Sequence, residues 1–290
     1  MKPLVSLITV NYRQAEVTLA LLKSIRESAV PALEVILVDN DPVEWVDFES
    51  ALPGIQVIRT EKNLGFAGAN NLGMKKAQGS YFLLVNNDTE INPNLIHQLL
   101  SCFSNPTVGA VCPIIRYHED PTKIQFSGFT PINSITGRNE LLKTLPRLVA
   151  ETPYFHGAAV MISAEAVKKS GLMCDSYFLY YEELDWSIRV RNAGFKILVT
   201  PNAFIDHKES ISTGKNSPLK LYYQTRNRVH FMRKNSGSFL LFLIFFCLVS
   251  FPKKWLSLQF RREKPHLKAY TKAFQDSIIS PQYGMRDWAA

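Results

Sequence analysis

The chain has 290 residues, of which 46% are hydrophobic, and this composition excludes an intrinsically disordered polypeptide. Its net charge of +8 is uneven, because residues 1–207 hold 18 basic and 21 acidic side chains, whereas residues 208–290 hold 15 basic and 4 acidic ones. The four cysteines are far apart and show no metal-ligand spacing, and the apolar run 4–10 is too short for a signal peptide. We therefore expect a reducing, cytoplasmic setting and a basic tail that attracts phosphate groups.

Apolar runs alternate with helical patterns over the first 85 residues. The runs 4–10, 34–38, 54–58 and 81–85 have the pattern of strands, and residues 19–25 place apolar side chains at helical spacing. This alternation predicts an α/β fold with a mostly parallel central sheet and helices on both faces.

Two amides and a carboxylate follow the strand predicted at 81–85. They are Asn86, Asn87 and Asp88, and they stand at the carboxyl end of that strand, where open α/β sheets bind ligands. A carboxylate held there suits a divalent cation and the phosphates that the cation carries. The alternative is turn chemistry between a strand and a helix capped by Asn92.

Further polar and small residues follow the other strands. Asp39 ends the strand at 34–38, where it could hydrogen-bond a nucleotide's ribose or base, and Gly65 and Gly68 lie in a small-residue segment that opens a helix. Tight packing of that helix on the sheet is an equal alternative for the glycines. Neither the dinucleotide-binding nor the P-loop fingerprint is present.

Three carboxylates lie within one predicted helical turn at Glu182, Glu183 and Asp185. Their repulsion raises at least one proton affinity and suits a general base. A solvated acidic helix start is the alternative. The neighbouring aromatic residues argue against it, and we expect Trp186 or Tyr181 to line an acceptor sugar. Residues 114–150 carry scattered proline and glycine and are predicted to form an irregular loop on the acceptor side.

The tail contains an apolar run of 14 residues, 238–251, that is short of the roughly 20 needed for a membrane-spanning helix. Pro252 is expected to end it, and a basic cluster follows. Residues 238–264 therefore predict a peripheral anchor on the cytoplasmic membrane surface, with a buried core helix or an oligomer contact as alternatives. We place a catalytic domain at 1–235 and a helical, membrane-associating tail at 236–290.

The motifs together resemble family 2 glycosyltransferases with the GT-A fold. The resemblance rests on Val-Asp-Asn at 38–40, Asn-x-Gly-Phe-Ala-x-Ala-Asn at 63–70, Asn-Asn-Asp-Thr at 86–89, Glu-Glu-Leu-Asp-Trp at 182–186 and an Arg-Asn pair at 226–227. It extends over roughly residues 4–234, and the layout is closest to rhamnosyltransferase-like enzymes of bacterial surface polysaccharide synthesis. A helix is expected from Leu219 to Lys234, and residues 266–288 resemble the amphipathic ending of such enzymes.

The resemblance implies a role for each motif. Transfer would be inverting, with Glu183 as the base, although Glu182 stays open because many relatives carry Asp at this position. Asp88 would bind magnesium or manganese, helped by His207, which could instead be a hydrogen-bonded loop histidine. The acceptor would contact the segment His156, Gly157 and Ala158. The residues assigned to the nucleotide sugar are Val10, Asn11, Tyr12, Asp39, Asn40, Asn63, Gly65, Phe66, Asn70, Asn86, Asn87, Arg226 and Asn227.

The implied donor is a dTDP- or UDP-sugar, and the implied acceptor is a saccharide linked to a polyprenyl diphosphate. Two other functions remain open, namely a glycoside hydrolase with paired carboxylates and a non-catalytic, membrane-peripheral protein that binds phosphate or nucleotides. No base-reading motif favours nucleic acid, and an oligomer is compatible with the sequence.

Overall fold

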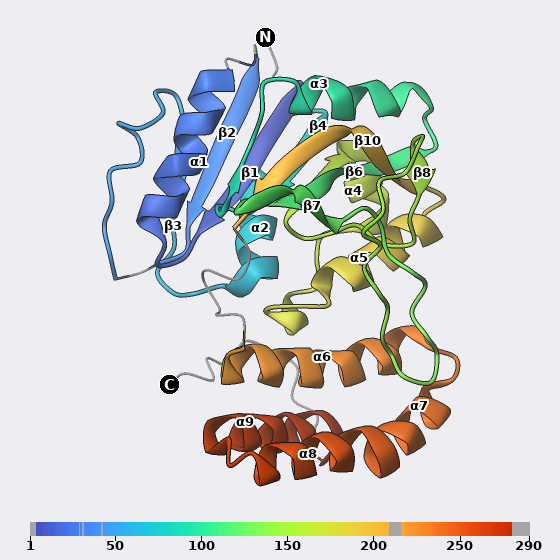
Figure 1. The fold of residues 1–290 in the computed structure, drawn as a ribbon. Helices are drawn as coiled ribbons and strands as arrows, with labels where there is room; N and C mark the ends of the chain where they lie inside the picture. Colours follow the sequence, from blue (N-terminus) through green and yellow to red (C-terminus); the bar gives the residue numbers. More distant parts are fainter. Residues whose placement is uncertain (1–3, 29, 31, 42, 209–215, 280–290) are drawn as a thin grey trace.

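The four strands predicted near the amino terminus all form, and they build one side of a ten-stranded central sheet (Figure 1). The computed structural model describes residues 4–28, 30, 32–41, 43–208 and 216–279. Among these residues the sheet runs β3-β2-β1-β4-β9-β6-β10-β5, with β7 beside β6 and β8 beside β10. The strands are β1 (Val5–Asn11), β2 (Leu33–Asp39), β3 (Gln56–Arg59), β4 (Tyr81–Val85), β5 (Thr89–Glu90), β6 (Val108–Tyr117), β7 (Asp120–Phe126), β8 (Ala150–Glu151), β9 (Ala159–Ser163) and β10 (Lys196–His207).

The strand order reverses at β1, and this reversal creates a place for a ligand. The chain moves outward from β1 to β2 through α1 and returns from β3 to β4 through α2, so right-handed crossovers put the two helices on opposite faces. Between the carboxyl ends of β1 and β4 neither helix covers the sheet edge, which is where open α/β sheets bind ligands. The helices of this part are α1 (Ala15–Ser28), α2 (Gly65–Lys76), α3 (Leu95–Leu100), α4 (Ala164–Ser170) and α5 (Glu182–Asn192), with short helical turns at Ser101–Ser104 and Asp175–Tyr177.

The parallel character holds for β3-β2-β1-β4 and for the pair β6 and β10, whereas the rest of the sheet is mixed. β9 runs antiparallel to both of its neighbours, β4 and β6. β5 pairs antiparallel with the end of β10, which sets His207 opposite Thr89. Two residues distant in sequence, Asp88 and His207, therefore reach the same edge of the sheet.

The segment predicted to be irregular, 114–150, is partly regular. β6 continues to Tyr117 and turns into β7, which pairs with it antiparallel. Between Phe126 and Ala150 the chain is irregular apart from one bridge, and Figure 1 shows this stretch extending from the sheet to the C-terminal helices.

Four helices lie beyond the carboxyl ends of the strands, with α6 between the sheet and the others (Figure 1). The predicted helix at 219–234 is confirmed as α6, and buried side chains of α6 and α7 share a hydrophobic cluster with Tyr177 and Leu184 of the preceding region. This cluster crosses residue 235, where we expect the domain boundary, and the boundary itself stays a prediction. The elements are α6 (Pro218–Asn235), α7 (Phe239–Phe245), a π-helical turn (Phe246–Ser250), α8 (Phe251–Phe260), α9 (Lys264–Phe274) and a second π-helical turn (Gln275–Ile279).

The helix does not end at Pro252, contrary to the sequence prediction. A π-helical turn over Phe246–Ser250 shifts the hydrogen bonding ahead of the proline, so the ring and the missing N–H are tolerated. The resulting helix, Phe239–Phe260, has 22 residues and is by length and composition able to cross a membrane, a test that core helices of soluble proteins also pass. Only 11% of its most apolar window is buried, which disfavours a core helix. The C-terminal part of the predicted amphipathic ending, 280–288, lies outside the described residues.

Candidate active site

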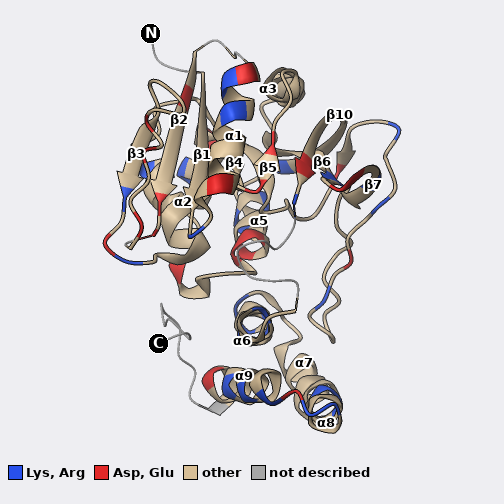
Figure 2. Ribbon diagram, turned by 60° about the vertical axis from the view of Figure 1, so that its left-hand side comes forward, with Lys and Arg blue, Asp and Glu red and all other residues tan. Residues whose placement is uncertain are grey.

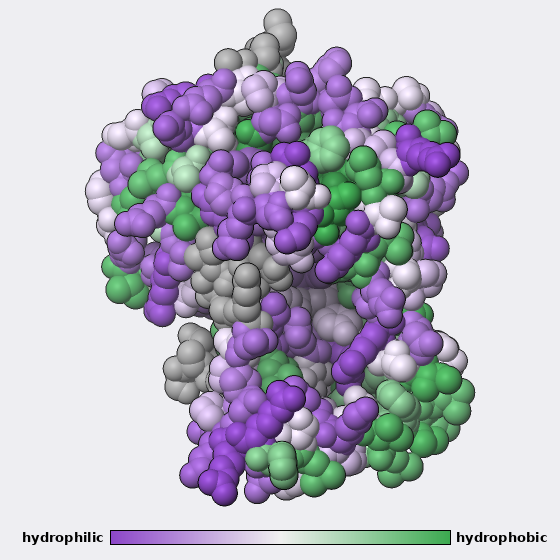
Figure 3. Space-filling view, viewed as in Figure 1, coloured by the Kyte–Doolittle hydropathy of each residue, from purple (hydrophilic) through white to green (hydrophobic). Residues whose placement is uncertain are grey.

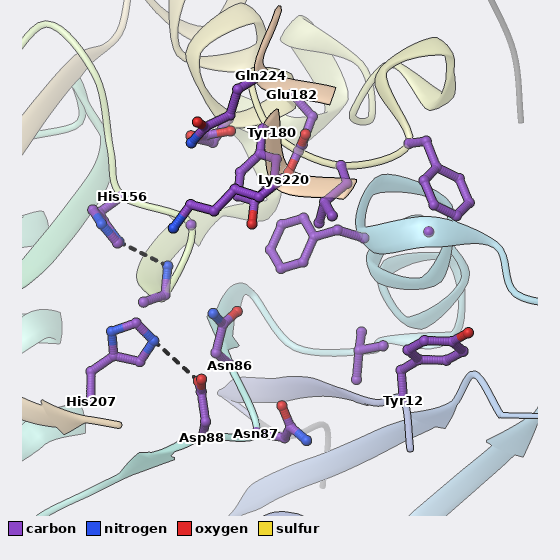
Figure 4. A pocket seen from close by; sticks show the side chains of 18 of the residues that line it. Tyr12, Asn86, Asn87, Asp88, His156, Tyr180, Glu182, His207, Lys220 and Gln224 are labelled. Atoms are coloured by element: carbon purple, nitrogen blue, oxygen red, sulfur yellow. Dashed lines mark hydrogen bonds and ion pairs between the residues drawn. The ribbon is translucent and has the colours of Figure 1, made fainter. Parts of the chain in front are cut away.

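A cavity of about 420 Å³ opens between the carboxyl ends of the strands and the elements α5 and α6. Figure 4 shows Asn86, Asn87 and Asp88 on the sheet side and Glu182 with Lys220 on the opposite wall. A volume of this size suits a small-molecule ligand. The predicted site residues that line the cavity are Val10, Tyr12, Asn40, Asn63, Gly65, Phe66, Asn86, Asn87, Asp88, His156, Gly157, Ala158, Glu182, Glu183 and His207.

Asp88 and His207 face each other at the bottom of the cavity (Figure 4). Nε2 of His207 lies 3.1 Å from Oδ1 of Asp88, and both side chains are nearly buried. Nδ1 of His207 lies 2.8 Å from Oε1 of Gln125. Because an amide oxygen only accepts, this contact assigns the hydrogen to Nδ1, and the ring directs Nε2 toward the carboxylate of Asp88.

This arrangement fits a cation. Oδ1 of Asp88 is buried and forms no hydrogen bond within the described part of the chain, and Nε2 of His207 lies 3.1 Å from it. Carboxylate oxygen and imidazole nitrogen are both ligands for divalent metals. Among the described residues no third His, Cys, Asp or Glu joins the pair. A metal held here would therefore complete its coordination with phosphate oxygens and water.

Glu182 and Glu183 begin helix α5 on the opposite wall. Each has one buried carboxylate oxygen without a hydrogen-bond partner. Burial raises the pKa of Glu183 to about 7, and burial together with the neighbouring Glu183 raises the pKa of Glu182 well above its ordinary value. The pair therefore holds a proton near neutral pH, and a carboxylate with a pKa near 7 suits a general base. The alternative of a solvated acidic helix start is wrong, because both glutamate side chains are buried from solvent.

A strained turn delivers the two glutamates. Phe178, Tyr180 and Tyr181 all have positive φ, at 64°, 67° and 75°, a conformation that costs free energy for residues other than glycine. Asn227 of α6 donates from Nδ2 to the carbonyls of Tyr177, Leu179 and Tyr180, at 2.9, 2.7 and 2.8 Å. These hydrogen bonds hold the backbone that precedes Glu182.

Arg226 and Asn227 do not line the cavity, which corrects their predicted contact with the nucleotide sugar. Both are essentially buried. Arg226 donates from Nη2 to the carbonyls of Ser176 and Tyr177 at 3.0 and 2.8 Å. Their side chains are thus fully used in holding the turn before α5.

The structure also corrects the predicted roles of two residues of helix α5. Trp186 is completely buried, packs edge-on against Phe155 and donates its indole N–H to the carbonyl of Gly171 at 2.7 Å. Asp185 is buried beside Lys234, whose ammonium lies 2.9 Å away and, with other hydrogen bonds, lowers the pKa of Asp185. Position in the helical turn explains both, because these side chains point to the core and not to the cavity.

Asp39 and three other predicted residues lie behind the cavity wall. Asn11 donates to Asp39 at 2.8 Å, and burial raises the pKa of Asp39. Asn70 donates to the carbonyl of Phe66, within its own helix. Tyr181 is directed away from the cavity, and its hydroxyl donates to the carbonyl of Gly137 at 3.4 Å. None of the three side chains therefore lines the cavity as predicted, nor does that of Asp39.

Sequence reasoning missed several polar residues of the site. Lys220 and Gln224 lie one turn apart on α6 and project toward the cavity (Figure 4). Thr18 accepts from Asn87 and donates to Asn11, each at 2.9 Å, which ties the ends of β4 and β1 together. The i, i+4 spacing of Lys220 and Gln224 was readable, but only the tertiary fold shows which face of α6 meets the cavity.

The model of the family described as glycosyl transferase family 2 matches residues 6–171. The chain belongs to this family. Its membership decides against a glycoside hydrolase and a non-catalytic binding protein, and it makes this protein a glycosyltransferase.

The relatives are distant in sequence. The glycosyltransferase is 25% identical to the low-salt glycan biosynthesis hexosyltransferase Agl10 of Haloferax volcanii, over 80% of this chain and 75% of the relative. It is 24% identical to the N-acetylglucosaminyl-diphospho-decaprenol L-rhamnosyltransferase of Mycobacterium tuberculosis, over 74% of this chain and 80% of the relative. A third relative, the y4gI protein of Sinorhizobium fredii, is 26% identical, and the chain spans only 27% of its length. A rhamnosyltransferase among the relatives agrees with the resemblance drawn from the motifs.

Solved structures confirm the GT-A fold. The glycosyltransferase superposes on Staphylococcus aureus TarS 1-349 in complex with UDP-GlcNAc with a TM-score of 0.60 and 16% identity, covering 96% of this chain and 82% of that one. It superposes on the mannosyltransferase PcManGT of Pyrobaculum calidifontis, in complex with GDP-Man and Mn²⁺, with a TM-score of 0.59 and 15% identity, covering 97% and 77%. At such identities the likeness concerns the fold alone.

Proposed function

We propose that this glycosyltransferase transfers a sugar, such as rhamnose or another hexose, with inversion from a dTDP- or UDP-sugar to a saccharide carried on a polyprenyl diphosphate. The observation that carries the proposal is a single cavity with the Asp88–His207 pair on one wall and the Glu182–Glu183 pair on the other. One wall suits a diphosphate, and the other suits a hydroxyl that must lose a proton.

On the donor side, Asp88 and His207 would bind the divalent cation that neutralises the diphosphate. Magnesium or manganese bound to Asp88 Oδ1 and His207 Nε2 would supply positive charge to the departing diphosphate. Gln125, with Oε1 2.8 Å from Nδ1 of His207, would hold the ring so that Nε2 is directed at the site. Lys220, on the opposite wall, adds a cation of the protein itself.

On the acceptor side, Glu183 takes the proton of the acceptor hydroxyl. The oxygen then attacks the anomeric carbon, the bond between that carbon and the diphosphate oxygen breaks, and the electron pair leaves with the diphosphate. One displacement without a covalent intermediate inverts the anomeric configuration. Burial and the neighbouring Glu183 also raise the pKa of Glu182, so a proton held by the pair lowers the charge beside the base.

We also propose that the enzyme lies on the inner face of the cytoplasmic membrane without crossing it. Helix α8 packs against α9, and α9 packs against α6, so the chain returns to the catalytic part right after its apolar helix. A spanning helix would leave α9 on the far side of the bilayer. An apolar helix held parallel to α6 is suited to the interfacial plane.

A transfer assay tests the proposal. Purified enzyme is incubated with dTDP-rhamnose, or with UDP-hexoses, and a polyprenyl-diphosphate-linked N-acetylglucosamine, and both nucleoside diphosphate and glycosylated lipid are measured. Glu183→Gln should lower the turnover by about 10²-fold or more, since it removes the base. The control Glu165→Gln changes an exposed carboxylate that pairs with Lys169 and should leave turnover unchanged. Full activity of Glu183→Gln would refute the assignment.

A further inference from the structure

A second cavity, of about 870 Å³, lies between the irregular segment 130–140 and the helix α7–α8. Arg138 and Asn139 line it from the segment, and Lys253 and Lys254 line it from α8. It is therefore separate from the active-site cavity and has a strongly basic lining. The only acidic residue that lines it, in the described part of the chain, is Glu140.

The positive charge of this cavity is not neutralised by the protein. Across the described residues, Arg138, Lys253 and Lys254 form no ion pair. Two buried donors beside it, Nδ2 of Asn139 and Nε of Arg228, have no hydrogen-bond partner. Since buried polar groups are normally bonded, the two unused donors indicate a ligand that offers acceptors, and the exposed cations of Arg138, Lys253 and Lys254 favour one that is anionic.

Arg228 links helix α6 to the lining of the basic cavity. Its side chain is 6% exposed, and its Nη2 donates to Oγ of Ser250, which lines the cavity. A Cβ added at Gly137 would lie 3.2 Å from Cγ of Arg228, so segment and helix α6 are in close contact there.

The two cavities share a wall. Glu140 lines the basic cavity, and the next residue, Leu141, lines the active site. The hydroxyl of Tyr181, the residue before Glu182, donates to the carbonyl of Gly137 in the same segment. A molecule in the basic cavity therefore lies next to the acceptor side of the active site.

An apolar surface adjoins the basic cavity. Phe245 and Val249 line the cavity, and Leu241 and Leu248 on the same helix are 58% and 72% exposed. Figure 3 shows hydrophobic side chains gathered over this end of the C-terminal helices, and Figure 2 shows the basic residues of α8 and α9. The ligand thus fits an anionic group attached to a long apolar chain.

We propose that the basic cavity binds the diphosphate group of the lipid-linked acceptor, with the lipid chain along the apolar face of α7 and α8. This inference rests on the proposed function and adds to it a site for the acceptor's carrier. Bound there, the diphosphate would place the first sugar at the shared wall, next to Glu182 and Glu183. Arg138, Lys253, Lys254 and the amide of Asn139 would donate to the phosphate oxygens.

The test measures binding of farnesyl diphosphate, a soluble polyprenyl diphosphate, to the full chain. Lys253→Gln/Lys254→Gln should weaken binding about tenfold or more, because charge-assisted hydrogen bonds are lost. The matched control Arg261→Gln/Arg262→Gln removes the same charge at the end of the same helix, outside the cavity, and should change binding less than about twofold. Asp88→Ala changes the other cavity and should leave farnesyl diphosphate binding unchanged. A failure of the nucleotide site would therefore not affect this measurement, whereas a failure of this inference would.

Three results would overturn the inference. If both double variants weakened farnesyl diphosphate binding equally, the ligand would be attracted by the general positive charge of the surface and not bound in the cavity. Equal affinity for inorganic pyrophosphate and farnesyl diphosphate would mean that the apolar chain is not recognised. Binding to phosphatidylglycerol vesicles that depends on Lys253 and Lys254, without binding of farnesyl diphosphate, would mean a general lipid contact.

Discussion

Burial of the Glu182–Glu183 pair raises both pKa values, which suits a general base but lowers the stability of the fold at neutral pH. Both pKa values are raised in the folded state, chiefly by burial, so the folded protein binds protons that the unfolded chain releases. For a carboxyl whose folded pKa is raised, the stabilisation is complete below the unfolded pKa and is lost as pH rises through the folded pKa. Glu183 should therefore contribute a loss of stability as pH rises from about 4.5 to about 7, and Glu182 a further loss in the same direction.

We predict that Glu183→Gln stabilises the protein at pH 8 although it lowers turnover. A neutral amide avoids the buried charge, so the free energy of unfolding should rise by about 1–3 kcal/mol at pH 8 and by little at pH 4.5. Urea unfolding at both pH values measures it. Equal effects at the two pH values would contradict the raised pKa of Glu183.

We predict that Gln125→Ala weakens metal-dependent nucleotide binding although Gln125 is not a proposed ligand. Without the acceptor at Nδ1, the His207 ring loses its fixed tautomer and orientation, and loss of such a partner lowers metal affinity about 10–100-fold. The manganese dependence of UDP or dTDP binding measures the effect. Gln125→Glu keeps an acceptor oxygen and should restore most of the affinity, whereas a purely structural role of Gln125 would show the same manganese dependence in all three proteins.

At the scale of elements, α6 acts as a support for the catalytic turn. We predict that Asn227→Ala lowers the free energy of unfolding by about 2–4 kcal/mol, because three carbonyls lose a buried donor and the positive-φ backbone loses its support. Turnover should fall more than the substrate KM changes, since Glu183 is displaced. Asn202→Ala, at an exposed position of β10, is the control. A stability change no larger than that of the control would refute the supporting role.

The same elements show what the sequence could predict. Each of the first strands was readable because a continuous apolar run ends in polar residues, and Asn86 to Asp88 did reach the cavity. The roles of Trp186, Arg226 and Asn227 were not readable, because the side of a helix that meets the cavity depends on tertiary packing. The π-helical turn before Pro252 was equally hidden, since local proline rules predict only the end of a helix.

At the scale of the whole molecule, the basic tail and the catalytic cavity form one assembly on a membrane surface in our account. We predict that Leu240→Gln/Leu248→Gln weakens binding to phosphatidylglycerol-containing vesicles about tenfold or more, because two side chains that are 67% and 72% exposed leave the apolar face. The melting temperature should stay unchanged. Co-sedimentation measures binding, and Leu148→Gln/Val149→Gln, which changes two exposed apolar side chains directly before β8, serves as the control. Unchanged vesicle binding would contradict the peripheral anchor.

The most direct measurement for the central claim is calorimetric binding of UDP and dTDP, each with and without Mn²⁺, to the wild type and to Asp88→Ala. The account predicts that one nucleotide binds the wild type only with the metal and that Asp88→Ala loses this binding, because Oδ1 of Asp88 and Nε2 of His207 form the site. Metal-independent binding, or binding that Asp88→Ala retains, would contradict the assignment of the diphosphate to this wall of the cavity.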